Sequence, residues 1–132
     1  MLRTGLAASA LFMAVVAHAA ETPPIKIGVL TDMAGPYAAI TGKGAVVAAK
    51  LAIEDFQKEA PDQKVELLSA DHQNKPDIAT GIARKWFDVD GVSMVSELTT
   101  SAVALAVQKL AEDKNRVSIA SGAGSSDLTG KA

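Results

Sequence analysis

The chain has 132 residues, which by length corresponds to one domain. Lysine and arginine number 13 and aspartate and glutamate 15, so the formal charge is −2 and the basic excess of a nucleic-acid binder is missing. The sequence contains no cysteine, which excludes disulfides, thiolate metal sites and a cysteine nucleophile. Because the charge is slightly negative, we expect no nucleic-acid partner.

The beginning of the chain has the pattern of a secretory signal peptide. Arg3 gives a positive start, residues 6–16 form an uncharged apolar run, and Ala17 and Ala19 fit the small positions of an A-x-A cleavage site. The run is too short to span a bilayer, which needs roughly 20 apolar residues. A buried N-terminal helix is the alternative. We expect residues 1–19 to be removed and a soluble, exported product to remain.

Segments typical of strands alternate with segments typical of helices along the rest of the chain. In chain order, we expect strands at residues 25–30, 64–70, 92–96 and 116–120, and helices at residues 42–59, 76–88 and 100–114. Such alternation implies parallel βαβ units with right-handed crossovers. Because the strands are mostly apolar, both faces of the sheet should be covered. The predicted fold is a three-layer α/β/α lobe with a mostly parallel sheet.

Helical spacing also predicts which side chains are buried. Trp86 and Phe87 in the second helix are expected in the core rather than at a ligand. No helix is expected directly after the fourth strand, although a complete doubly wound domain would continue there. The apolar side chains of the first helix should pack on the sheet, and they are Val46, Val47, Leu51, Ile53 and Phe56.

The loops at the carboxyl ends of the strands are the first place to look for a site, because ligands of open parallel sheets bind there. These loops are residues 31–37, 71–75, 97–101 and 121–126. Three of them lead into helix N-termini, whose free N–H groups favour negative charge. Thr99 and Thr100 are N-cap types whose hydroxyls can also meet a ligand. Gly122 and Gly124 let a backbone come close to a bound group. Together they predict a cradle for a carboxylate, with helix capping and an ordinary loop as alternatives.

Motifs of nucleotide binding and hydrolysis are incomplete. Residues 42–44 lack the glycine spacing and the Ser or Thr of a phosphate loop. Residues 122–124 follow a strand, but no helix opens at once and the dinucleotide fingerprint is absent. The sequence also lacks a Gly-x-Ser-x-Gly elbow. With no nucleophile–base pair and no metal set, we expect neither an enzyme nor a cofactor.

Three ionisable residues in these loops have structural interpretations. His72 is the only histidine besides His18 of the predicted signal peptide, and without a second histidine or a cysteine it does not predict a metal site. We expect it to have a surface or loop role. Asp32 and Asp71 end successive strands, and hydrogen bonds to loop N–H groups are expected there rather than a carboxylate pair.

Four stretches in this order resemble a known family. They are IKIGVLTDMAGPYA (25–38), VELLSADHQNKPDIA (65–79), residues 92–101, and IASGAGSSDLTG (119–130). With the predicted signal peptide before them, they resemble a periplasmic solute-binding protein of an ABC importer, in the leucine/isoleucine/valine-binding (type I) class. The resemblance covers essentially all of the predicted mature chain.

The resemblance implies a binding protein. In this family a Ser or Thr after the third strand and small residues after the fourth hold the ligand's carboxylate and amine, and a residue after the Gly-Pro of the first loop lines the pocket. The matching positions, with Ser125 of the fourth loop added, are Tyr37 or Ile40, Thr99, Thr100, Gly122, Ala123, Gly124 and Ser125. The implied role is capture of a small carboxylate-bearing solute in the periplasm by a monomer that delivers it to ABC permease subunits.

Two departures from the family pattern refine this expectation. Some members bridge the second-strand loop to the third by two cysteines, where this chain has Asn74 and Leu98. The loops at residues 71–77 and 122–127 resemble the branch whose ligands include aromatic and other organic acids, amides and urea-like solutes. The implied solute is therefore an amino acid, an amide or an organic acid.

Length is the largest departure. Family members have two lobes joined by a hinge, so residues 20–132 are expected to be an N-terminal lobe without its second lobe. Because closure depends on contacts in both lobes, we expect no micromolar binding by this chain alone. A ligand-sensing receptor domain of the same fold and an exported α/β enzyme are the alternative functions.

Overall fold

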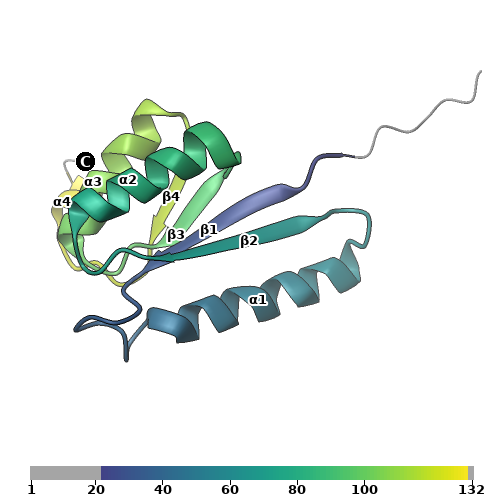
Figure 1. The fold of residues 1–132 in the computed structure, drawn as a ribbon, viewed down its shortest axis with the longest axis horizontal. Coiled ribbons are helices and arrows are strands. Elements are labelled where there is room, and N and C mark those ends of the chain that lie inside the picture. The colour runs from purple at the N-terminus through teal and green to yellow at the C-terminus, as the bar shows by residue number, and fades with distance from the viewer. Residues whose placement is uncertain (1–21, 131–132) are drawn as a thin grey trace, which may run out of the picture.

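The computed structural model describes residues 22–130, so the predicted signal peptide lies outside the described residues. The elements are β1 (Ile25–Thr31), α1 (Gly42–Glu59), β2 (Val65–Asp71), α2 (Pro76–Lys85), the π-helical turn η1 (Trp86–Asp90), β3 (Met94–Glu97), α3 (Ser101–Asp113), β4 (Val117–Ala120) and α4 (Asp127–Gly130). The four strands form one sheet in the order β2-β1-β3-β4, and every neighbouring pair is parallel (Figure 1). The predicted fold class is confirmed.

The main core lies between the sheet and the layer formed by α2 and α3 (Figure 1). Trp86 and Phe87 are 6% and 4% exposed, which confirms their predicted burial. They pack with apolar side chains of β1, β3 and α3 that are almost fully buried, among them Leu30, Val95, Val103 and Val107. This core fixes the carboxyl ends of β1 and β3 relative to the start of α3.

The opposite face of the sheet carries α1, and here the predicted burial is wrong for three of the five apolar side chains, while Val46 and Ile53 are partly buried. Val47, Leu51 and Phe56 are 55%, 56% and 44% exposed. The reason is that α1 contacts β1 and β2 and leaves the other half of this face uncovered. On β4, at the edge of the sheet, Val117 and Ile119 are themselves about half exposed. One helix covers only part of a four-stranded face, so much of its apolar stripe has no partner within residues 22–130.

Two further features of the helices differ from expectation. The helix predicted at residues 76–88 ends as α2 at Lys85 and continues as η1, which closes at Gly91 in the left-handed region (φ 75°). The wider turn lets the Val92 N–H donate to the Trp86 carbonyl at 2.9 Å. A one-turn helix, α4, follows β4, contrary to the prediction that no helix would follow. Leu128 of α4 packs against the core.

The contact between β1 and η1 gives a direct test of the core. A Cβ atom at Gly28 would lie 2.5 Å from Cε3 and Cζ3 of the buried Trp86 ring. We therefore expect Gly28→Ala to lower the free energy of unfolding by about 1–3 kcal/mol, measured by urea denaturation. The matched control is Gly81→Ala in α2, where a Cβ would meet nothing within 4 Å and should stabilise the helix by about 1 kcal/mol. Equal effects of the two substitutions would contradict the packing described here.

Candidate functional site

The sheet has a topological switch point between β1 and β3. The loop after β1 leads to α1 on one face, whereas the loop after β3 leads to α3 on the other (Figure 1). Where neighbouring parallel strands send their chains to opposite faces, a crevice opens beyond their carboxyl ends, and ligands of such sheets bind there. The predicted site residues after β1, β3 and β4 all lie at this edge.

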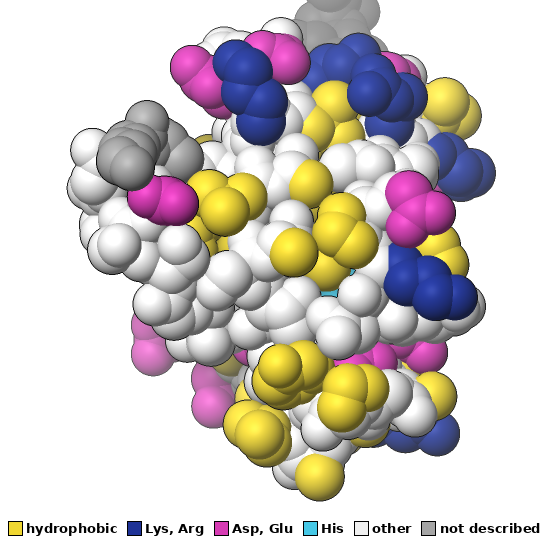
Figure 2. Space-filling view, turned by 90° about the vertical axis from the view of Figure 1, so that its left-hand side faces the viewer, with side chains coloured by type: hydrophobic (Ala, Val, Ile, Leu, Met, Phe, Trp, Pro, Cys, Tyr) yellow, Lys and Arg dark blue, Asp and Glu magenta, His cyan; other side chains and the backbone are white. Residues whose placement is uncertain are grey.

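Figure 2 shows this edge of the molecule. Lysine and arginine side chains lie at its periphery, while its centre consists mostly of uncharged groups. A negatively charged ligand at the centre would thus be held by N–H and hydroxyl groups rather than by lysines.

Hydroxyl groups link the first loop to the loop after β3. Thr41 Oγ1 lies 2.9 Å from Thr31 Oγ1 and 3.1 Å from Thr99 Oγ1, so three threonines from separate segments share a chain of hydrogen bonds. Thr31 is fully buried and Thr99 is 5% exposed. The Thr99 hydroxyl therefore ties the loops together. The sequence does not predict this role for Thr31 and Thr41, because nothing in their spacing shows that they meet Thr99.

Thr100 stands at the N-cap position of α3 but makes no side-chain cap bond. Its backbone is extended (φ −109°, ψ 144°), and its carbonyl accepts the Ala104 N–H at 2.8 Å. Its Oγ1 is buried and has no hydrogen-bond partner among residues 22–130. A buried hydroxyl without a partner is costly, so a group that accepts from Thr100 would gain more here than at an exposed hydroxyl. The capping alternative is not realised in this structure.

The loop after β4 approaches this position from the other side. A Cβ at Gly122 would lie 3.5 Å from the Thr99 carbonyl oxygen, so the two loops are in contact, whereas the space around Gly124 is open. Ser125 donates its N–H to Ser101 Oγ at 3.1 Å, which joins this loop to the first turn of α3. The structure thus brings Thr99, Gly122 and Ser125 around the start of α3.

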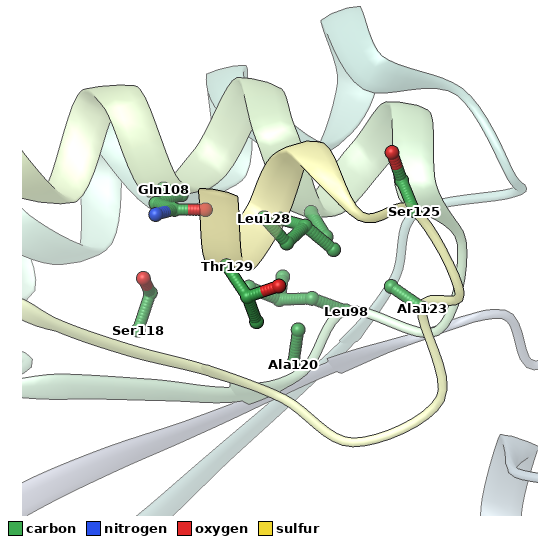
Figure 3. Close-up of a pocket in the computed structure, with 9 residues that line it drawn as sticks. Leu98, Gln108, Ser118, Ala120, Ala123, Ser125, Leu128 and Thr129 are labelled. Carbon is green, nitrogen blue, oxygen red and sulfur yellow. The ribbon is translucent and has the colours of Figure 1, made fainter. Parts of the chain in front are cut away.

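Two cavities flank this junction on opposite faces of the sheet. Ala123 and Ser125 line the first, of about 270 Å³, together with Leu128 and Thr129 of α4 (Figure 3). Gly122 lines the second, of about 530 Å³, beside Thr41 and the start of α1. The predicted residues of the fourth loop therefore divide between two cavities.

The first loop is held by two carboxylates. Asp32 is fully buried and accepts the Gly35 and Tyr37 N–H groups at 2.9 and 3.0 Å. Asp71 Oδ1 accepts the N–H groups of Met33 and Gln73 at 3.1 and 2.7 Å. The prediction that both carboxylates bind loop N–H groups is confirmed.

Two residues of the first loop, Tyr37 and Ile40, were predicted as alternatives for lining the pocket, and both are at the surface. Tyr37 is 37% exposed and Ile40 is 78% exposed. Ile40 lines the 530 Å³ cavity, but Tyr37 does not line either cavity at the junction. Within residues 22–130, Ile40 is therefore the better placed of the two.

His72 lies in the loop after β2, which confirms the loop alternative of its prediction, but it is fully buried, so the surface alternative is wrong. Its Nδ1 accepts the Asn74 N–H at 2.9 Å, which places the ring hydrogen on Nε2, and Nε2 has no hydrogen-bond partner in the part of the chain that the structure describes. Burial lowers the pKa of His72, against the opposing effect of the Asp32 and Asp71 carboxylates. Among residues 22–130 no group of three or more metal-ligating side chains occurs, so His72 is not part of such a cluster.

The lowered pKa predicts how stability depends on pH. Below the ordinary histidine pKa of about 6.5 the unfolded chain takes up a proton that folded His72 resists. The free energy of unfolding should therefore be highest above that value and fall as the pH drops through it toward the pKa of the folded state. Urea denaturation between neutral and mildly acidic pH measures this slope. His72→Asn, which keeps an acceptor for the Asn74 N–H, should flatten the slope; an unchanged slope would contradict the assignment.

Comparisons with known proteins agree with this fold. A family model described as a periplasmic binding protein matches residues 24–132. A periplasmic binding protein from Burkholderia mallei is 43% identical, with a TM-score of 0.75 over 80% of this chain and 28% of its own. A branched-chain amino acid ABC transporter periplasmic ligand-binding protein from Burkholderia xenovorans is 45% identical (TM-score 0.74, 78% of this chain and 28% of its own).

A third solved structure adds a ligand. The solute-binding protein of an ABC transporter from Rhodopseudomonas palustris, in complex with 3,4-dihydroxybenzoic acid, is 28% identical, with a TM-score of 0.72 over 80% of this chain and 29% of its own. No curated protein matches the sequence. The chain spans less than a third of the length of these three structures.

Proposed function

This chain belongs to the periplasmic binding protein family, and on that premise we propose that it is the solute-binding component of an ABC importer, which captures a small carboxylate-bearing solute in the periplasm. Two similar structures support the solute class: one is named for branched-chain amino acids and the other holds a dihydroxybenzoic acid. Both kinds of molecule carry a carboxylate. Members of this family bind ligands rather than transform them, so the exported-enzyme alternative is set aside.

The observation that carries the proposal is the buried hydroxyl of Thr100 at the start of α3. The first-turn N–H groups of a helix have no partner within the helix, and their dipoles favour negative charge. A carboxylate placed there accepts from the Thr100 hydroxyl and from these N–H groups at once. Ser125, tied to Ser101, and Gly122, against Thr99, close the site from the side of β4.

The proposed mechanism has three steps. The solute binds at the switch point on the lobe formed by residues 20–132, a second lobe closes over it, and the closed form docks on the permease. Two lobes and a hinge are what the family resemblance implies. Among the described residues, no helix combines the length and the apolar character needed to cross a bilayer. A ligand-sensing receptor of the same fold would bind its solute at the same site and would differ from an importer component only in the protein that it contacts.

Replacing Thr100 tests the proposal. We expect Thr100→Val to weaken the affinity for L-leucine or for 3,4-dihydroxybenzoate roughly tenfold or more, because a hydrogen bond to a charged group is lost. Since one lobe alone should bind weakly, the affinity is measured from amide chemical shifts during a titration to the solubility limit of each probe. The control is Thr80→Val in α2, whose hydroxyl donates to the Pro76 carbonyl at 2.9 Å. Equal affinities of the two variants for both probes would refute the role of Thr100.

A further inference from the structure

The turn between β2 and α2 has an unusual backbone. Gln73 and Asn74 are consecutive residues with positive φ, 52° and 54°, and neither is glycine. Side chains are disfavoured in this region because Cβ crowds the backbone, although asparagine tolerates it better than most residues. Residues held in this way concentrate at ligand clamps and switch regions. The turn of residues 73–75 therefore depends on the contacts that hold it.

Three hydrogen bonds hold this turn. The Gln73 N–H donates to Asp71 Oδ1 at 2.7 Å, and the Lys75 N–H donates to the His72 carbonyl at 2.9 Å. The third bond runs from the Asn74 N–H to His72 Nδ1 at 2.9 Å. Only this third bond requires a neutral imidazole, because a protonated ring carries hydrogens on both nitrogens and cannot accept.

The His72 ring is enclosed at the carboxyl end of the sheet. The residue is 0% exposed, and its backbone N–H donates to the Thr31 carbonyl of β1 at 2.9 Å. Side chains alternate along a strand, so His72 follows Leu68 and Ala70, which pack against the core. Its Nε2 has no hydrogen-bond partner within residues 22–130. Protonation would therefore put a charge and two donors without acceptors in a buried position.

The two carboxylates beside the ring also hold the first loop. Asp32 lies directly after β1 and is buried, and both of its oxygens already accept N–H groups of that loop. Asp71 Oδ1 accepts the N–H groups of Met33 in the first loop and of Gln73 in the turn. The first loop and the turn of residues 73–75 are thus joined through the groups that surround His72.

Burial disfavours the protonated ring more strongly than the carboxylates favour it. Desolvation lowers the pKa of His72, against the opposing charges of Asp32 and Asp71. Lys75 and Asp77, the next ionisable residues along the chain, are exposed. The closed turn and the neutral ring therefore stabilise each other, and a proton taken up by the ring favours the open turn by linkage.

We propose that His72 is a pH-sensitive latch: its neutral ring keeps the turn of residues 73–75 closed, and protonation releases Asn74 and loosens the turn together with the first loop. An imidazolium that turns toward Asp32 competes with the loop N–H groups that this carboxylate holds. Two of the four loops at the carboxyl edge of the sheet are then ordered at neutral pH and mobile in mildly acidic surroundings. The latch does not depend on which solute binds.

Backbone order parameters from nitrogen relaxation, measured at a series of pH values, test the latch. We expect the values at residues 33–37 and 73–75 to fall from about 0.85 at neutral pH to below about 0.6 as the pH is lowered. The midpoint of this fall should coincide with the titration of the His72 ring, which is followed by its carbon chemical shifts. The turn at residues 60–63, closed by the Gln63 N–H bond to the Ala60 carbonyl, is the internal control and should keep its order.

Two variants separate the ring from other acid-sensitive groups. His72→Asn keeps an acceptor for the Asn74 N–H but does not titrate, so both segments should stay ordered over the whole pH range. Asp77→Asn removes an exposed carboxylate from the first turn of α2 and leaves the ring in place, so the fall in order should persist.

Three results would overturn the latch. The first is that residues 73–75 stay rigid while the His72 ring titrates, and the second is that α3 loses order in the same step, because the proton then unfolds the whole chain. Both are measured on the unsubstituted chain, so they hold even where His72→Asn does not fold. The third is a fall in order that persists in His72→Asn. A fall confined to residues 33–37 and 73–75 and absent from His72→Asn supports the inference.

Discussion

Replacing Trp86 by alanine is expected to lower the free energy of unfolding by about 3–5 kcal/mol. The indole is 6% exposed, lies directly against Gly28 of β1 and belongs to the core beneath α2 and α3. Its removal leaves a cavity at the point where η1 meets the sheet. Because Trp86 is the only tryptophan, unfolding in urea is followed by circular dichroism rather than by fluorescence.

A neighbour in the same turn provides the control. Val89 also lies in η1 but is 74% exposed, so Val89→Ala should change stability by no more than about 0.5 kcal/mol. If Trp86→Ala cost no more than Val89→Ala, the packing of η1 against β1 would be wrong.

The second large effect is expected at Asp32. Asp32→Ala removes two of the acceptors that hold the first loop, the oxygens that accept the Gly35 and Tyr37 N–H groups, and leaves the bond from the Met33 N–H to Asp71. Since hydrogen bonds to charged groups contribute about 1.5–3 kcal/mol each, we expect a loss of about 3 kcal/mol in the free energy of unfolding. Hydrogen exchange at the Gly35 and Tyr37 amides should accelerate in the same variant.

A surface aspartate serves as the comparison. Asp55 forms a pair with Lys58 on the exposed side of α1 at 2.8 Å, and Asp55→Ala should be nearly neutral. Unchanged exchange at Gly35 and Tyr37 in Asp32→Ala would mean that the carboxylate does not hold the loop.

The alternation of segments was enough to predict the parallel sheet and the burial of Trp86, because period and composition are local properties of the sequence. The burial of α1 was predicted wrongly because burial, unlike period and composition, is not a local property of the sequence. Val47 and Leu51 have the spacing of a buried stripe, but burial depends on what lies opposite, and β4 is not covered by α1. Likewise, no local pattern distinguishes a surface histidine from the fully buried His72.

The site was predicted in part. The position of Thr100 before a helix that follows a strand is a pattern visible in the sequence, whereas the burial of its hydroxyl is not. The hydroxyl link between Thr41 and Thr99 joins residues far apart in the chain, so it depends on the approach of two loops.

The central claim is that the solute binds where β1 and β3 diverge. An amide chemical-shift map of the chain titrated with L-leucine and with 3,4-dihydroxybenzoate tests it most directly. We expect the largest shifts at Thr99, Thr100, Gly122 and Ser125. The claim would be contradicted by the absence of shifts with either probe. It would equally be contradicted by shifts centred on the apolar hollow between α1 and the amino ends of β1 and β2, around Ile27, Phe56 and Val65.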